Sequence, residues 1–112
     1  MNGEYDLYLE LRQKERELET SLRQLRVTSM ARAKAEREYK ILLRKECLRL
    51  RDEGMAIGMI DKTCYGIPSV ADLRFQRDIA DGVYKANQEA VNVFKLEIRI
   101  LEGQIQREWG QK

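Results

Sequence analysis

Two long segments with helical periodicity, residues 4–53 and 69–109, are joined by a connector, residues 54–68, that holds three of the seven glycines and the only proline. Apolar residues recur every three or four positions in both segments, as they do on one face of a helix. A helix of this length is not stable alone, so each segment must pack lengthwise on a partner. The sequence therefore predicts an all-α fold: a long antiparallel, coiled-coil-like helical hairpin that forms a single domain, residues 1–112.

The overall composition agrees with this class and excludes several others. Charged residues make up 36% of the chain and aromatic residues 7%, which is typical of helices with paired charges and not of a β-sandwich or barrel. The apolar fraction of 43% is too high, and too regularly spaced, for a disordered chain. No apolar run approaches the roughly 20 residues that cross a bilayer, and no secretory signal is recognisable. We therefore expect a cytoplasmic protein.

The first segment carries its apolar face at intervals dominated by three, four and seven residues: Leu7, Tyr8, Leu11, Leu18, Leu22, Leu25, Tyr39, Leu42, Leu43 and Leu50. Asn2 is the expected N-cap, and Glu4 and Asp6 suit the positive end of the helix dipole. Gly54 follows a basic last turn and is expected at the C′ position, where the backbone often adopts the left-handed conformation.

The second segment has a start signal and a regular seam. Ser69 is the expected N-cap, with Asp72 at the N3 position of a capping box. The seam positions alternate by four and three, which is a heptad pattern. They are Leu73, Arg77, Ala80, Tyr84, Asn87, Val91, Phe94, Ile98, Leu101 and Ile105.

A second apolar line flanks this seam, so that apolar residues cover an arc of roughly 160°, at about 100° per residue. One antiparallel partner covers less than that. The excess favours self-association into a dimer or higher oligomer, most simply two hairpins in a four-helix bundle. The alternative is that the connector folds over part of the extra line. The expected oligomer interface consists of Ile79, Val83, Ala86, Ala90, Val93 and Ile100.

Folding the chain back at the connector pairs positions whose residue numbers add to about 119–122. In that register Leu25 lies near Phe94, and Asn87 lies opposite a stretch of the first segment that lacks leucine. A polar layer at mid-hairpin is therefore expected from Ser29, Arg32, Glu36 and Asn87. We favour a layer that sets the helix register, as a buried Asn does in coiled coils; the alternative is a ligand or partner site.

Charge is distributed unevenly, although the formal net charge is only +2. Residues 1–22 hold three Lys/Arg and six Asp/Glu, whereas residues 23–51 hold ten Lys/Arg and three Glu. A helix N-terminus attracts anions, so the turn end is the expected site for a phosphate-bearing or acidic partner; the alternative is a solvated basic face. The candidate binding residues are Arg44, Lys45, Arg49, Arg51, Ser69, Arg74 and Arg77.

The connector has two interpretations. Glycines around a short apolar stretch, followed by a helix start, faintly resemble a helix-turn-helix, whose second helix would present Val70, Arg74 and Gln76 to DNA. However, the spacing differs by one residue from the usual motif, and the second helix is very long and not strongly basic in its first turns. We favour a tight structural loop with a short helix at residues 56–63.

Catalytic and metal-binding patterns are missing from the sequence. It contains no His, no glycine-rich phosphate loop and no nucleophile elbow. Two cysteines, Cys47 and Cys64, are too few for a structural zinc site, and Cys47 lacks a base partner. Reduced thiols are expected, with a disulfide between them as the alternative. We expect a protein that is not an enzyme and that binds no cofactor and no metal.

One family resemblance covers most of the chain. It rests on the order of the segments 39–45, 48–54, 73–74, 95–97 and 105–109, together with Asp78 and Tyr84. This order is similar to that of small helical proteins encoded by phages and prophages of Gram-positive bacteria. The resemblance implies an accessory protein in the cytoplasm of an infected or lysogenic cell, where it binds a host or phage component.

These expectations describe a non-enzymatic, self-associating protein that acts by binding. Our first hypothesis is an inhibitor that sequesters a host factor, with a role against host defence. The alternatives are a DNA- or RNA-binding accessory or regulatory protein that uses the basic turn end, and a virion or assembly scaffold. A steep loss of affinity for duplex DNA with rising salt would favour the nucleic-acid alternative.

Overall fold

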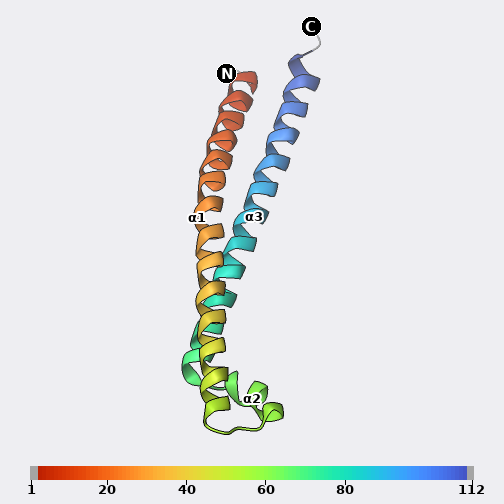
Figure 1. Cartoon of the computed structure of the whole chain (residues 1–112). Helices are drawn as coiled ribbons and strands as arrows, with labels where there is room; N and C mark the ends of the chain where they lie inside the picture. Colours follow the sequence, from red (N-terminus) through yellow and green to blue (C-terminus); the bar gives the residue numbers. More distant parts are fainter. Residues whose placement is uncertain (1–2, 111–112) are drawn as a thin grey trace. The chain divides into compact units, whose positions relative to one another are not determined.

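A computed structural model of the chain describes residues 3–110, and within that range it contains three helices (Figure 1). Helix α1 spans Gly3–Asp52, α2 spans Ile57–Cys64 and α3 spans Pro68–Trp109. The described residues form no strand, so the all-α class and the helical hairpin are confirmed. None of the described helices contains an apolar stretch that could cross a membrane. The expected N-cap, Asn2, lies outside the described residues.

Contacts divide the chain into two compact units. Unit 1 combines the part of α1 up to residue 27 with the part of α3 from residue 85 onward. Unit 2 comprises residues 28–84: the rest of α1, all of α2 and the start of α3. Within each unit the segments of α1 and α3 run antiparallel (Figure 1).

A Schellman motif closes α1, as Gly54 predicts. Gly54 has a φ of 91°, in the left-handed region that glycine adopts without steric cost. Its N–H donates to the carbonyl of Arg51 at 3.0 Å, and the N–H of Met55 donates to the carbonyl of Leu50 at 3.1 Å. These two bonds satisfy carbonyls that the end of a helix leaves open, so Gly54 determines where α1 stops.

The start of α3 differs from the prediction. The helix begins at Pro68, and the N–H of Ala71 donates to the carbonyl of Ile67 at 2.9 Å. Ile67 therefore takes the N-cap position, and Pro68 takes N1, where its fixed φ suits the helix and its missing N–H costs nothing. Ser69 lies inside the first turn, so the expected capping box with Asp72 is wrong.

Helix α2 packs on the last turns of α1 and creates the most enclosed core of unit 2. Leu50, Ile60 and Cys64 are buried there, and the side chains packed around them are those of Leu43, Cys47, Met55 and Ile67. Because α2 and the residues before α3 already cover the end of α1, α3 pairs with earlier turns of α1.

The helix register is shifted accordingly. In unit 2 the ion pairs Arg32–Asp81 and Glu36–Arg77 both join positions that add to 113. In unit 1 the pair Lys14–Glu97 adds to 111, and the Lys14 ammonium lies 5.9 Å from the Phe94 ring centre. The expected sum of 119–122 is therefore wrong in both units.

The heptad seam of α3 is confirmed, because every predicted position is partly or fully buried. Val91, Leu101 and Ile105 are the most buried seam residues. On α1 two expected core residues are wrong: Tyr8 is 44% exposed and Leu22 is 45% exposed. Each stands one position beyond a residue that is half-buried, Leu7 and Ser21, and so points away from α3.

Candidate functional site

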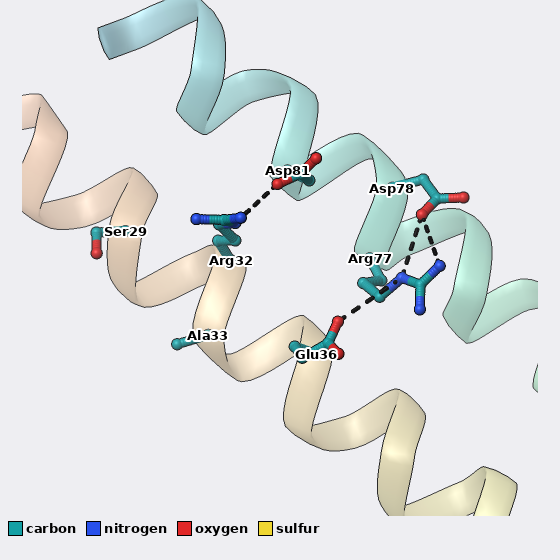
Figure 2. A pocket seen from close by; sticks show the side chains of 7 residues that line it. All are labelled: Ser29, Arg32, Ala33, Glu36, Arg77, Asp78 and Asp81. Carbon is teal, nitrogen blue, oxygen red and sulfur yellow. Dashed lines mark hydrogen bonds and ion pairs between the residues drawn. The ribbon is translucent and has the colours of Figure 1, made fainter.

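Charged residues of α1 and α3 frame an open cavity of about 520 Å³ in unit 2 (Figure 2). Its lining is Ser29, Arg32, Ala33 and Glu36 from α1, and Arg77, Asp78 and Asp81 from α3. Figure 2 shows Arg32 of α1 reaching towards Asp81 of α3, and Arg77 of α3 joined both to Asp78 of its own helix and to Glu36 of α1.

The same spacing of Arg, acidic residue and Tyr occurs on both helices: Arg32, Glu36 and Tyr39 on α1, and Arg77, Asp81 and Tyr84 on α3. We call these six residues the arginine clamp. Each triplet spans two helical turns, so its members share one face of their helix. Antiparallel helices that carry the same triplet can exchange contacts reciprocally.

The contacts of the clamp are reciprocal. Arg32 Nε lies 2.7 Å from Asp81 Oδ1, and its guanidinium carbon lies 4.9 Å from the Tyr84 ring centre. In return, Arg77 Nε lies 3.7 Å from Glu36 Oε2, and its guanidinium carbon lies 4.5 Å from the Tyr39 ring centre. The two halves thus repeat the same two kinds of contact, an ion pair and a cation–π contact.

The main asymmetry of the clamp comes from Asp78. Its carboxylate accepts hydrogen bonds from Arg77 Nε and Nη2 at 3.1 and 3.0 Å, and these bonds raise the pKa of Arg77. The equivalent position on α1 is Ala33, which offers no competing acceptor. Asp78 therefore accounts for the longer Arg77–Glu36 distance.

The expected polar layer is only partly correct. Ser29, Arg32 and Glu36 do share one cavity, but Asn87 lies in unit 1, where its Nδ2 donates to the carbonyl of Ser21 at 3.1 Å. The shifted register separates them. Because the charged groups of the clamp neutralise one another, the geometry favours a register-setting role over a ligand site. The repeated triplet was the sequence signal for the partners that the prediction missed.

The basic residues expected to converge at the turn end do not all do so. Arg49 is held by Glu46 at 2.6 Å and Glu53 at 2.8 Å, contacts that raise its pKa. Arg77 belongs to the clamp, and Arg74 stacks over Tyr65 at 5.6 Å. Arg49, Arg74 and Arg77 are thus engaged in contacts within the chain, and the joint site with Ser69 at the N-terminus of α3 stays a prediction.

One of the residues that a helix-turn-helix would present to DNA is not accessible in this structure. Val70 is completely buried in the first turn of α3. A recognition helix must present such a position to base edges, and this side chain faces the protein interior instead.

A basic face of α1 remains available in unit 2. It consists of Arg37, Ile41, Arg44, Leu48 and Arg51, which are separated by four, three, four and three residues. All five are exposed, Ile41 and Leu48 at 42% each. The three arginines make no ion pair with any residue of the described chain, and neither does the neighbouring Lys45. We call this surface the α1 basic face.

A cavity of about 240 Å³ opens at the connector end of this face. It is lined by Arg44, Cys47, Leu48 and Arg51 of α1, and by Ile57, Ile60 and Asp61 of α2. Ile57 is 77% exposed, so apolar surface continues from α1 onto α2. The α1 basic face therefore combines cations with places where apolar side chains can be buried.

The expected oligomer interface is mostly solvent-exposed on α3. In unit 2, Ile79 and Val83 are 50% and 51% exposed. In unit 1, Ala86, Val93 and Ile100 are exposed, whereas Ala90 is half-buried beside the seam residue Val91. Self-association itself stays a prediction.

No family model matches this chain, and comparisons with curated proteins and with solved structures gave no significant match. Among residues 3–110 no three side chains of Cys, Asp or Glu gather as a group that could hold a metal ion. The argument for function therefore rests on the geometry of the faces described above.

Proposed function

We propose that this chain is a non-enzymatic binding protein whose α1 basic face docks an acidic amphipathic helix of a partner protein and so inhibits or sequesters it. The observation that carries the proposal is the alternation of three arginines, which form no ion pair among residues 3–110, with Ile41 and Leu48 at heptad spacing. That spacing fits a second helix laid along α1. The arginines require carboxylates on the partner, and the two aliphatic residues require apolar side chains between them.

The apolar residues are the reason for preferring a protein partner to nucleic acid. A surface that tracks phosphates needs cations, and often aromatic side chains on which bases stack. Ile41 and Leu48 supply neither, yet they occupy the centre of the α1 basic face. Nucleic acid binding is the alternative that the experiment below must separate.

The resemblance to small phage and prophage proteins supplies the context of the proposal. In that context the partner is a host component, such as a factor of host defence. The chain then works by occupying a surface that the host component needs, and it requires no chemistry of its own.

The direct test is a titration with two labelled probes: a helical peptide with Leu at heptad positions and Glu between them, and a duplex DNA. Wild-type protein should bind the peptide. Arg37→Glu/Arg44→Glu/Arg51→Glu should weaken that binding by about tenfold or more, because it replaces attraction by like-charge repulsion. Ile41→Ser/Leu48→Ser should weaken it without changing net charge.

The matched control reverses three exposed arginines of unit 1, Arg26→Glu/Arg99→Glu/Arg107→Glu, and changes net charge by the same amount. It should keep most of the affinity for the peptide. Equal loss in both triple variants would reduce the interaction to non-specific charge attraction. Tighter binding of DNA than of peptide, with a steep dependence on salt, would favour the nucleic-acid alternative. A pull-down from host lysate treated with nuclease, with wild type and the first triple variant side by side, then identifies the partner.

A second part of the proposal is self-association through the exposed line of α3. In unit 1, Ala86, Val93 and Ile100 recur every seven residues and leave an apolar strip uncovered. A second copy of the chain would cover it. Light scattering should give a dimer or larger species at micromolar concentration, and Val93→Glu/Ile100→Glu should dissociate it. A mass of 13.2 kDa for the wild type would contradict this part of the proposal.

A further inference from the structure

The two cysteines of unit 2 lie in contact, although 17 positions separate them in the sequence. Cys47 on α1 and Cys64 on α2 place their sulfur atoms 3.3 Å apart, and both are free thiols. A disulfide needs a sulfur–sulfur distance of about 2.05 Å, so a small approach of the two side chains would suffice. The core that holds α2 against α1, with Leu50 and Ile60 at its centre, includes both cysteines and so keeps them together.

The two thiols differ in access to solvent. Cys64 is completely buried, and its Sγ also lies 3.6 Å from the carbonyl of Leu43. Burial raises its pKa to about 11, with a further contribution from the contact with Cys47. Cys47 is half-buried and lines the 240 Å³ cavity that opens to solvent. A reagent from solution therefore reaches Cys47 first.

The cavity around Cys47 has a definite charge pattern. Arg44 and Arg51 stand one turn before and one turn after Cys47 and have no partner among the described residues. Asp61 of α2 lies on the same lining. Two guanidinium groups favour a reagent that carries carboxylates, and Asp61 offers an acceptor for its ammonium group. A small peptide disulfide such as glutathione disulfide has both.

We propose that Cys47 and Cys64 form a thiol–disulfide exchange site, in which Cys47 reacts with an anionic low-molecular-weight disulfide and Cys64 then closes an intramolecular disulfide. In the first step the Cys47 thiolate attacks one sulfur of the reagent, the reagent's S–S bond breaks, and one thiolate leaves and takes up a proton. In the second step the Cys64 thiolate attacks Cys47 Sγ and displaces the second thiolate. Overall, two protein thiols are oxidised to one disulfide and the reagent is reduced to two thiols.

Mass spectrometry of the full chain incubated with oxidised glutathione tests this sequence of steps. Wild-type protein should lose two hydrogen masses per chain without forming disulfide-linked dimers. Cys64→Ser should stop at a stable glutathione adduct on Cys47, and Cys47→Ser should react far more slowly than wild type. An adduct on Cys64 in the Cys47→Ser variant at the wild-type rate, or only disulfide-linked dimers, would overturn the proposal.

A second variant tests the role of charge without touching the buried core. Arg44→Gln/Arg51→Gln changes exposed residues only and should slow the reaction with oxidised glutathione by about tenfold at low salt. The reaction with neutral hydroxyethyl disulfide should be unchanged. An equal effect on both reagents, or on neither, contradicts recognition of an anionic disulfide. Since the reagents act on the free chain, these outcomes do not depend on whether the α1 basic face binds a partner.

Discussion

Unit 2 and unit 1 use the same two long helices but stabilise them differently. Unit 2 has a third helix, α2, whose Cys64 is completely buried in the core with Leu50 and Ile60, and the arginine clamp joins α1 and α3 through two reciprocal contacts. Unit 1 has a two-helix seam with Val91, Leu101 and Ile105 as its buried residues. A seam between two helices stays open on both sides, whereas a third helix encloses it. We therefore expect unit 1 to open locally more readily than unit 2.

The largest effect should come from the three-helix core. Leu50→Ala should lower the free energy of unfolding by about 3 kcal/mol. The substitution leaves a cavity between α1 and α2, and the surrounding side chains can fill it only in part. Urea unfolding followed by circular dichroism measures the change. Leu48→Ala, two residues away and 42% exposed, is the control and should cost less than about 0.5 kcal/mol. Similar losses in both variants would show that α2 does not enclose Leu50.

A smaller loss is expected in the seam of unit 1. Leu101 is 7% exposed, and Leu101→Ala should cost about 2 kcal/mol, because a two-sided seam can relax more than an enclosed core. Its control is Leu96→Ala, at a position that is 51% exposed. Hydrogen exchange should show faster amide exchange in unit 1 and little change in unit 2. A uniform increase along the whole chain would mean that the two units open together.

The two glycines within α3 allow units 1 and 2 to be compared by substitutions that stabilise the protein. A Cβ at Gly82 in unit 2 would meet nothing within 4 Å, so Gly82→Ala should stabilise the protein by about 1 kcal/mol. A Cβ at Gly103 in unit 1 would approach Arg107 Nη1 at 3.3 Å, so Gly103→Ala should stabilise it less. Thermal unfolding of the two variants measures the difference. The reverse order would indicate that Gly82 is needed for a contact with another molecule.

The smallest effects should come from single contacts of the arginine clamp. A double-mutant cycle with Arg32→Met and Asp81→Asn should give a coupling of about 0.5 kcal/mol, because both side chains are partly exposed and solvent screens them. A second cycle, with Arg77→Met and Glu36→Gln, should give less, because Asp78 competes for Arg77. Arg26→Met, paired with Asp81→Asn as a control, should show no coupling. A larger value in the second cycle would contradict the assigned role of Asp78.

The features that the sequence predicted correctly are those that depend on local spacing. The heptad seam of α3 needs only the alternation of four and three, and the end of α1 needs only one residue that accepts a positive φ. The predicted start of α3 is wrong because Ser69 is a common N-cap residue and was assigned that role. Proline at N1 is also a start signal, and the helix begins at Pro68.

The helix register could not be read in the same way. The register depends on how α2 packs on α1. That packing includes the contacts of Cys64 with Leu43 and Cys47, which are tertiary contacts that the spacing of apolar residues does not predict. In the observed register the two triplets of Arg, acidic residue and Tyr lie opposite each other and contact each other. Arg44 and Arg51 form no ion pair within the described part of the chain, because no carboxylate stands three or four positions from either, whereas Arg49 has Glu46 and Glu53.

The reciprocal design of the arginine clamp has a consequence for chain exchange. Each helix carries both the donor and the acceptor half, so the clamp specifies an alignment but not whether its two halves belong to one molecule. Two copies that exchanged their α3 helices would recover the same contacts at the same distances. Only the connector, through the high effective concentration that it gives α3 beside its own α1, makes the closed form win over a swapped pair. Shortening the connector until α3 can no longer fold back on its own α1 would thus shift the protein towards swapped dimers without altering a single clamp residue.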